Sequence, residues 1–252
     1  MTGLCWLRDR AFAHRGLHDL EAGRPENSSA AVRAAIERGY GVEIDVQLAG
    51  DGTPVVFHDL RLERLTGQAG LVRDRSVTDL KTLTLLATSE TIPTLTDVLN
   101  LIDGRAPLLV EIKSRFDGDL TLVRAVLTCL KDRSEPLALM SFDPDVLAEA
   151  ARLAPDLTRG LVSCAFDRPE EWPMLSASQR AALADVASFG TTVPGFLAYD
   201  QRSLPAIEVE TFCTENALPL LSWTVRSRDR ADALKRHVDQ IIFEGFDPSH
   251  DD

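Results

Sequence analysis

Seven charged or titratable side chains in the first half of this 252-residue sequence could together carry out one reaction. They lie in four short motifs and are His14, Arg15, Glu43, Asp45, His58, Glu111 and Lys113. Three carboxylates provide the oxygen ligands that a hard divalent cation, Mg²⁺ or Ca²⁺, prefers. An arginine and a lysine facing that cation would repel it unless an anion lay between them, and a phosphate group fits this place. Two imidazoles could then accept and donate a proton, so the pattern predicts metal-assisted cleavage of a phosphodiester.

Each of these residues also has an ordinary explanation when it is considered alone. Arginines at strand ends and Glu-x-Lys pairs are common on protein surfaces and contribute little. A convergence of all seven on one rim favours a site. The expected roles are cation ligands for Glu43, Asp45 and Glu111, phosphate contacts for Arg15 and Lys113, and acid–base catalysis for His14 and His58.

The elements that would position these groups begin with a predicted hairpin. Apolar and polar residues alternate in Gly41–Leu48, which is typical of a strand with one apolar and one polar face. An extended apolar run resumes at residues 54–58 after a glycine-rich break. A hairpin centred just after Asp51 would place Asp45 and His58 opposite each other.

Strand and helix patterns then alternate along the rest of the chain. The extended segments are expected at residues 11–13, 41–48, 54–58, 107–113, 137–142, 159–164, 194–199, 219–225 and 240–244. Because residues 54–58 fit better as a hairpin return, eight strands remain, the number in a TIM-type (β/α)8 barrel of the α/β class. We expect one domain over residues 1–252, with a small insertion at about 60–92, between His58 and Glu111. Active sites of such barrels lie at the carboxyl ends of the strands, where the candidate residues fall.

The amino-acid composition limits the kinds of molecule that this protein is expected to bind. The formal net charge is -12, which disfavours binding to nucleic acid. No apolar run approaches the ~18 residues of a membrane span, so stable membrane insertion is not expected. There is no secretory signal pattern, and the four cysteines form no CxxC pair; we therefore expect a cytoplasmic location. The expected partner is a small-molecule phosphodiester substrate.

The ordered motifs resemble those of the glycerophosphodiester phosphodiesterase family over nearly the whole chain. They are His14-Arg15-Gly16, Glu26-Asn27, Glu43-Ile44-Asp45, His58-Asp59, Leu62-x-Arg64-x-Thr66, Glu111-Ile112-Lys113, Ser141-Phe142 and Trp223-Thr224-Val225. The resemblance implies a TIM-type barrel with an insertion, a divalent cation and a role in lipid metabolism. It implies hydrolysis of glycerophosphodiesters to an alcohol and glycerol 3-phosphate, with the residue roles given above. It also suggests an initial attack by a substrate hydroxyl that forms a cyclic phosphate.

Two positions depart from the family pattern. Arg226 stands where the family often has asparagine, and Glu244 stands where the last strand often ends in Thr-Asp. Both departures put the identity of the alcohol in doubt and leave the chemistry intact. The candidate substrate-pocket residues are Glu26, Asn27, Phe142, Trp223 and Glu244; the two aromatic residues could equally be core.

Three other functions compete with hydrolysis. A lysophospholipase D-like or cyclic-phosphate-forming activity on lysophospholipids would favour an apolar entrance, and no amphipathic anchor is evident. A non-enzymatic binder would be expected to lack one of the two histidines. A glycosidase using Glu43 and Glu111 would explain the acids but not Arg15 or Lys113. The sequence leaves open the native metal, the preferred alcohol and the oligomeric state.

Overall fold

The computed structural model describes residues 4–86, 88–131, 133 and 135–249, which divide into two compact units. The N-terminal unit lies within residues 12–113 and 120–137. The C-terminal unit comprises residues 4–11, 114–119 and 138–249. Along these described ranges, eight parallel strands alternate with helices, and a ninth strand, β3 (Pro54–Val56), is antiparallel. The predicted fold class, an α/β barrel of the TIM type, is confirmed.

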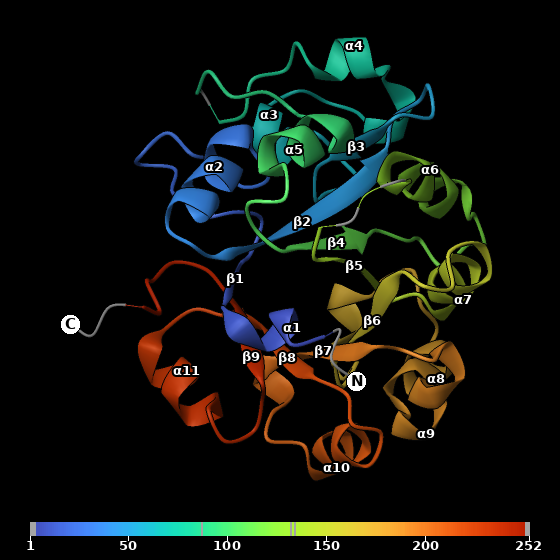
Figure 1. The fold of residues 1–252 in the computed structure, drawn as a ribbon. Coiled ribbons are helices and arrows are strands. Elements are labelled where there is room, and N and C mark those ends of the chain that lie inside the picture. Colours follow the sequence, from blue (N-terminus) through green and yellow to red (C-terminus); the bar gives the residue numbers. More distant parts are fainter. Residues whose placement is uncertain (1–3, 87, 132, 134, 250–252) are drawn as a thin grey trace. The chain divides into compact units, whose positions relative to one another are not determined.

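Strand β2 (Gly41–Leu48) is central to the N-terminal unit (Figure 1). It lies between β1 (Phe12–Ala13) and β4 (Leu108–Ile112), which both run parallel to it. β3 pairs with the far end of β2 as the return of the predicted hairpin. The helices of this unit are α2 (Ser29–Glu37), α3 (Glu63–Thr66), the 3-10 helix η1 (Val72–Asp74), α4 (Val77–Leu80), α5 (Leu95–Ile102) and α6 (Thr121–Leu130).

The hairpin register differs by one residue from the prediction. Phe57, not His58, lies opposite Asp45, and its N–H donates to the Asp45 carbonyl at 2.9 Å. The reason is the turn, in which Asp51 Oδ1 accepts a hydrogen bond from the Thr53 N–H at 3.1 Å. This side-chain turn centres the hairpin on Asp51 rather than after it, so every pairing shifts by one position.

Capping side chains fix where two helices of this unit begin. Ser28 Oγ accepts a hydrogen bond from Ala31 N and starts α2. Thr94 and Asp97 form the predicted capping box at the start of α5. These caps satisfy N–H groups that would otherwise lack partners, so the helices begin at defined residues.

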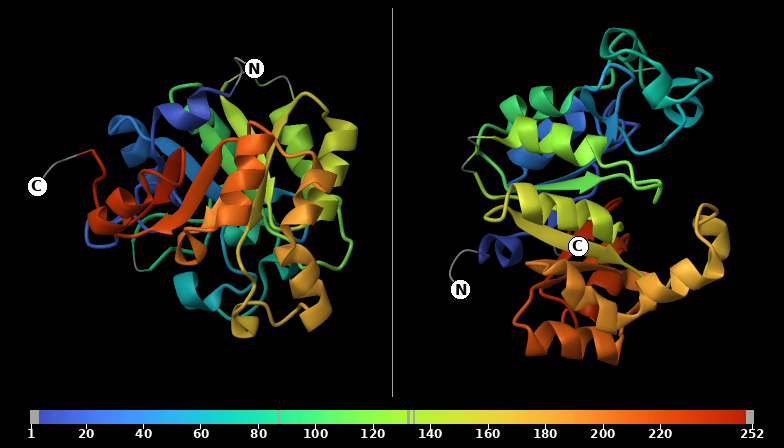
Figure 2. Two further views of the ribbon diagram at one scale, coloured as in Figure 1. Left: turned by 90° about the horizontal axis from the view of Figure 1, so that it is seen from below. Right: turned by 90° about the vertical axis from the view of Figure 1, so that its right-hand side faces the viewer.

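The predicted insertion that follows β3 packs on a small apolar core that it shares with the β2–β3 hairpin. Its helices α3 and α4, in the teal part of Figures 1 and 2, contribute to this core together with β3. The buried core residues are Ala49, Val55, Phe57, Leu62, Leu65, Val72, Leu80, Leu85 and Ile92. Apolar packing therefore holds α3 and α4 in place, although each has only four residues.

The C-terminal unit contains the later strands in chain order. β5 (Leu137–Ser141), β6 (Thr158–Ser163), β7 (Phe196–Asp200), β8 (Leu220–Val225) and β9 (Gln240–Phe243) pair successively in parallel. The helices are α1 (Trp6–Asp9), α7 (Pro144–Leu153), η2 (Pro169–Glu171), α8 (Ala177–Ala184), α9 (Val186–Phe189), η3 (Gly190–Thr192), η4 (Gln201–Ser203), α10 (Ile207–Glu215) and α11 (Arg228–Leu234). Within the described part of the chain, no helix has the length and apolar character needed to span a membrane.

Candidate active site

Three buried carboxylates meet at the centre of the N-terminal unit. Glu43 and Asp45 project from the same face of β2, and Asp45 is in register with Glu111 on the neighbouring strand β4. The three side chains offer ligand oxygens that all lie within 4.8 Å of one another. Because the parallel register sets this spacing, the backbone brings the three acids together before any ion binds.

Two cations lie against this acidic cluster. Lys113 Nζ is 2.7 Å from Asp45 Oδ1 and also binds Glu111. Arg15 Nε is 3.2 Å from Asp45 Oδ2. Burial alone would raise the pKa of Asp45, but Lys113, His58 and Arg15 hold it well below its usual range. The five groups together carry one negative charge in excess if all are ionised.

Glu43 is in a different electrostatic environment from Asp45. Its side chain is buried, and burial together with the charges of Asp45 and Glu111 raises its pKa well above the usual value. Its Oε2 accepts a hydrogen bond from the Arg15 backbone N–H at 2.9 Å. No described residue donates a hydrogen bond to its buried Oε1. A buried carboxylate oxygen that receives no hydrogen bond from the protein is suited to bind a cation.

The loop after β1 has an unusual backbone that places Arg15. Arg15 has φ of 55° and Gly16 has φ of 75°, both in the left-handed region. A Cβ atom added to Gly16 would lie 2.7 Å from Ala31 C and 2.9 Å from Val32 N. The loop can therefore approach α2 closely only with glycine at this position. This approach fixes the loop that also carries the half-buried His14.

Asn27 supports the acidic cluster from the loop before α2. It is 1% exposed and also has a left-handed backbone, with φ of 59°. Its Nδ2 donates to Asp45 Oδ2 at 2.8 Å, and its Oδ1 accepts from Asp45 N at 3.2 Å. These two bonds fix the orientation of Asp45.

His58 is oriented by its neighbour in the chain. Its Nδ1 is 2.7 Å from Asp59 Oδ1, and its carbonyl accepts a hydrogen bond from Gln47 Nε2 at 2.9 Å. Burial would raise the pKa of Asp59, but the contacts with His58 and Arg64 hold it far below the usual range. Asp59 is therefore a carboxylate, which only accepts hydrogen bonds, so Nδ1 carries a proton, and in the neutral ring Nε2 has the lone pair.

A further group of charged side chains surrounds the centre of the site. Glu26 Oε1 is 2.6 Å from Arg15 Nη1, and both oxygens of Glu26 also bind Arg64. Arg64 in turn binds both oxygens of Asp59. The sequence motifs contain Asp59 and Arg64, but charge and spacing alone gave them no role, because their partners are set by the folded loops.

The structure therefore brings together in one unit all seven residues for which the sequence predicted chemistry. Against the effect of burial, Lys113, His58, Arg15 and His14 all lower the pKa of Asp45, as expected for groups close to this carboxylate. Glu26 and Asn27, predicted as pocket residues, are engaged with Arg15 and Asp45 respectively.

The remaining candidate pocket residues belong to the C-terminal unit. Phe142 and Trp223 are half-buried and stack edge to face, with ring centroids 5.4 Å apart. Phe142 also packs against Trp172 at 4.8 Å, and Trp223 Nε1 donates to the Ala198 carbonyl at 2.9 Å. The two rings thus form part of an aromatic cluster and keep some exposed area.

The two residues that depart from the family pattern contact each other. Arg226 Nε lies 2.7 Å from Glu244 Oε1. The Arg226 side chain is 62% exposed, whereas that of Glu244 is 18% exposed. The unusual arginine thus has a partner at the other unusual position, a pairing that the sequence did not predict.

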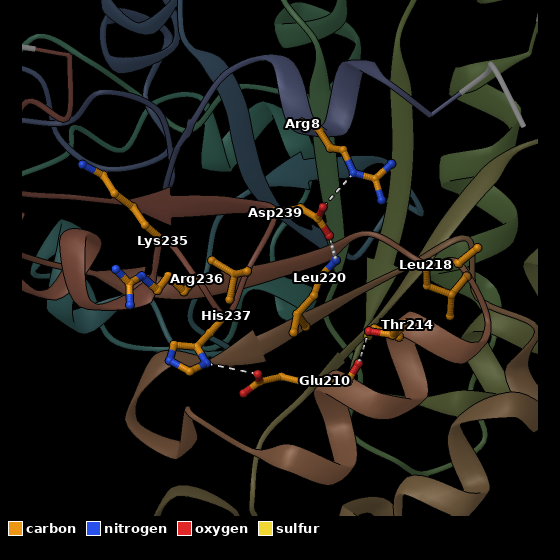
Figure 3. Close-up of a pocket in the computed structure, with 12 residues that line it drawn as sticks. Arg8, Glu210, Thr214, Leu218, Leu220, Lys235, Arg236, His237 and Asp239 are labelled. Atoms are coloured by element: carbon orange, nitrogen blue, oxygen red, sulfur yellow. Dashed lines mark hydrogen bonds and ion pairs between the residues drawn. The ribbon is translucent and has the colours of Figure 1, made fainter.

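A separate hollow of about 330 Å³ lies at the amino ends of β8 and β9 in the C-terminal unit (Figure 3). Arg8 Nε is 2.8 Å from Asp239 Oδ1, and His237 Nδ1 is 3.0 Å from Glu210 Oε2. Burial raises the pKa of the lining Cys213 thiol to about 12, so this cysteine is protonated at neutral pH. These groups give no reason to place the reaction here.

Comparisons with known proteins agree with this geometry. The family model described as "Glycerophosphoryl diester phosphodiesterase family" matches residues 14–247. A glycerophosphodiester phosphodiesterase of Caldanaerobacter subterraneus subsp. tengcongensis is 30% identical over 248 residues, which cover 94% of each chain. A solved phosphodiesterase from Oleispira antarctica, in complex with the product sn-glycerol-3-phosphate, has a TM-score of 0.77 and 27% identity, with 94% of this chain and 93% of that chain covered. A glycerophosphodiester phosphodiesterase from Thermotoga maritima has a TM-score of 0.72 and 26% identity, with 93% and 94% covered.

Proposed function

We propose how this chain works from an established premise: it belongs to the glycerophosphoryl diester phosphodiesterase family and is a phosphoric diester hydrolase. Its proposed reaction is hydrolysis of glycerophosphodiesters to an alcohol and glycerol 3-phosphate. It uses a divalent cation, Mg²⁺ or Ca²⁺, and acid–base catalysis by His14 and His58. The observation that carries the proposal is the buried cluster of three carboxylates bordered by an arginine and a lysine.

The donor set fits a hard divalent cation. Glu43, Asp45 and Glu111 would hold it, since their oxygens converge and Glu43 Oε1 has no hydrogen-bond donor among the described residues. A divalent cation and a singly charged phosphodiester would together cancel the excess negative charge of the five central groups. When bound, the cation would neutralise charge that grows on the phosphoryl oxygens during the reaction.

Arg15 and Lys113 would bind the phosphodiester itself. Arg15 is held by Glu26 and Asp45, so its guanidinium has a fixed orientation toward an anion. Lys113 would contribute a compact positive charge, and its neighbours Asp45 and Glu111 keep it protonated by raising its pKa despite its burial. We assign Glu26 and Asn27 to positioning of these groups. The candidates for contacts with the alcohol group of the substrate are still Phe142, Trp223 and Glu244.

The two histidines would move the protons. The orientation of His58 leaves its Nε2 as the acceptor or donor toward substrate, because Nδ1 is committed to Asp59. His14 would perform the complementary transfer from the loop after β1. A proton leaves the attacking oxygen as its bond to phosphorus forms, and a proton reaches the alcohol oxygen as its bond to phosphorus breaks.

The test is an assay of a panel of glycerophosphodiesters after removal of metals with EDTA and separate addition of Mg²⁺, Ca²⁺ or Zn²⁺. We expect release of glycerol 3-phosphate that EDTA abolishes and that Mg²⁺ or Ca²⁺ restores. Recovery with zinc alone would contradict the hard-cation assignment, and activity unaffected by EDTA would contradict the metal-dependent reaction. Phosphorus NMR of the products separates the alternative, because a lysophospholipase D-like or cyclizing enzyme would accumulate a lysophospholipid-derived or cyclic phosphate.

A further inference from the structure

Arg64 lies in the insertion and belongs to none of the roles assigned so far. It is the second residue of α3, and its side chain is 47% exposed. The neighbouring Leu62 and Leu65 are buried in the apolar core of the insertion, so packing fixes the position of α3 independently of Arg64. Its guanidinium points at two carboxylates that belong to different parts of the proposed site.

One side of the guanidinium reaches the histidine. Arg64 Nε donates to Asp59 Oδ2 at 2.6 Å, and Nη2 donates to Asp59 Oδ1 at 2.9 Å. The same Oδ1 atom binds His58 Nδ1 at 2.7 Å. A bidentate contact fixes both the position and the plane of the Asp59 carboxylate, which in turn fixes the His58 ring.

The other side of the guanidinium reaches the phosphate-binding arginine. Arg64 Nη1 donates to Glu26 Oε2 at 2.7 Å, and Nη2 donates to Glu26 Oε1 at 2.8 Å. Glu26 Oε1 also accepts from Arg15 Nη1 at 2.6 Å. Burial would raise the pKa of Glu26, but the contacts with Arg64 and Arg15 lower it, so this carboxylate stays ionised between two arginines.

We infer that Arg64 is a positioning residue that aligns His58 and Arg15 at the same time. The inference rests on the proposed function and adds to it a residue without contact to the reacting atoms. An isolated surface ion pair contributes little, but four charge-assisted bonds from one planar group form a network with a defined geometry. A lysine has one charged nitrogen and cannot make both bidentate contacts.

The kinetic test compares Arg64→Met and Arg64→Lys with the wild type. Loss of the Asp59 contact should lower kcat, and loss of the Glu26 contact should raise KM because Arg15 loses its orientation. We expect kcat to fall about 10–100-fold in Arg64→Met, the usual effect of removing a supporting partner of site residues. Arg64→Lys should recover part of the loss. The matched control is Arg61→Met, which removes a 64%-exposed arginine that pairs with Glu63, and which should leave both parameters within twofold.

A role confined to holding α3 in place would change the melting temperature but leave kcat and KM of the folded enzyme unchanged. That result for Arg64→Met would overturn the inference while leaving the proposed function intact. If Arg64→Met does not fold, Arg64→Lys decides in the same way: altered kcat and KM support the inference, and unaltered values overturn it.

A second measurement does not depend on activity, so it separates this inference from the proposed function. Asp59→Asn and Glu26→Gln are made singly and together, and their effects on the melting temperature are compared. With Arg64 present the two effects should not add, because both carboxylates share one guanidinium. In an Arg64→Met background the coupling should vanish or change sign, and an unchanged coupling would contradict a bridging role.

Discussion

Replacement of Asp59 by asparagine tests how the histidine is held. In the wild type, the Asp59 carboxylate accepts from three donors: His58 Nδ1 at 2.7 Å, Arg64 Nε at 2.6 Å and Arg64 Nη2 at 2.9 Å. An ionised carboxylate has acceptor capacity for all three. The side chains of Asn and Asp have nearly the same shape, so the substitution changes the hydrogen bonding with little change in packing.

The new amide cannot serve all three donors in either orientation. With its oxygen in the place of Oδ1, its NH₂ group faces the N–H of Arg64 Nε. With its oxygen in the place of Oδ2, its NH₂ group faces Arg64 Nη2 and donates to His58 Nδ1, which forces the ring proton onto Nε2. We expect kcat to fall about 10²–10⁴-fold, the usual contribution of a positioned acid or base. This corresponds to about 3–5 kcal/mol of activation free energy.

The assay measures initial rates of glycerol 3-phosphate release at saturating cation, together with thermal unfolding of each variant. The control is Asp74→Asn, which neutralises an exposed acid of the same insertion and should have wild-type rates. KM of Asp59→Asn should change little, because the contact between Arg64 and Glu26 is still present. A folded Asp59→Asn protein with kcat within threefold of the wild type would refute the tautomer argument.

Three further outcomes are expected. His14→Ala should lower kcat about 10²–10⁴-fold without a change in melting temperature, and turnover within tenfold of the wild type would count against its catalytic role. Gly16→Ala should destabilise the fold by about 1–3 kcal/mol in denaturant unfolding, since the new methyl group meets Ala31 in a left-handed backbone, and unaltered stability would contradict this close packing. Arg64 and Arg15 depress the pKa of Glu26, so its stabilisation is present above the unfolded pKa near 4.3 and is lost as pH falls. Glu26→Gln should therefore flatten the loss of stability between about pH 5 and pH 3, and an identical pH slope would show that the ion pair is not formed.

Local sequence patterns were sufficient to predict the strands of the fold and the grouping of three carboxylates in the candidate site. The alternation in β2 placed Glu43 and Asp45 on one face, and the register with β4 adds Glu111 beside Asp45. Parallel strands bring their carboxyl ends together, so residues far apart in sequence converge without specific contacts between them. The capping motif at Thr94 likewise depends on residues only three positions apart.

What the sequence did not predict depends on geometry beyond the repeat of a strand or helix. One side-chain turn at Asp51 moved the hairpin register and placed Phe57 opposite Asp45. Arg64 on α3 and Glu26 in the loop before α2 are 38 residues apart, and no spacing rule pairs side chains from two such distant segments. Asn27 was assigned to the pocket because its motif position is visible in the sequence, whereas its bonds to Asp45 depend on a left-handed backbone.

The short helices α3 and α4 are held against the β2–β3 hairpin by a shared apolar core, whereas β2 and β4 are joined by strand pairing. Short helices that are held mainly by side-chain packing can open locally while β2 and β4 keep their pairing. Such an opening would withdraw Arg64 on α3 and release both Asp59, which holds His58, and Glu26, which holds Arg15. We therefore expect the catalytic activity to be lost reversibly on heating. This loss should occur at temperatures where most backbone amides are still protected from exchange with solvent.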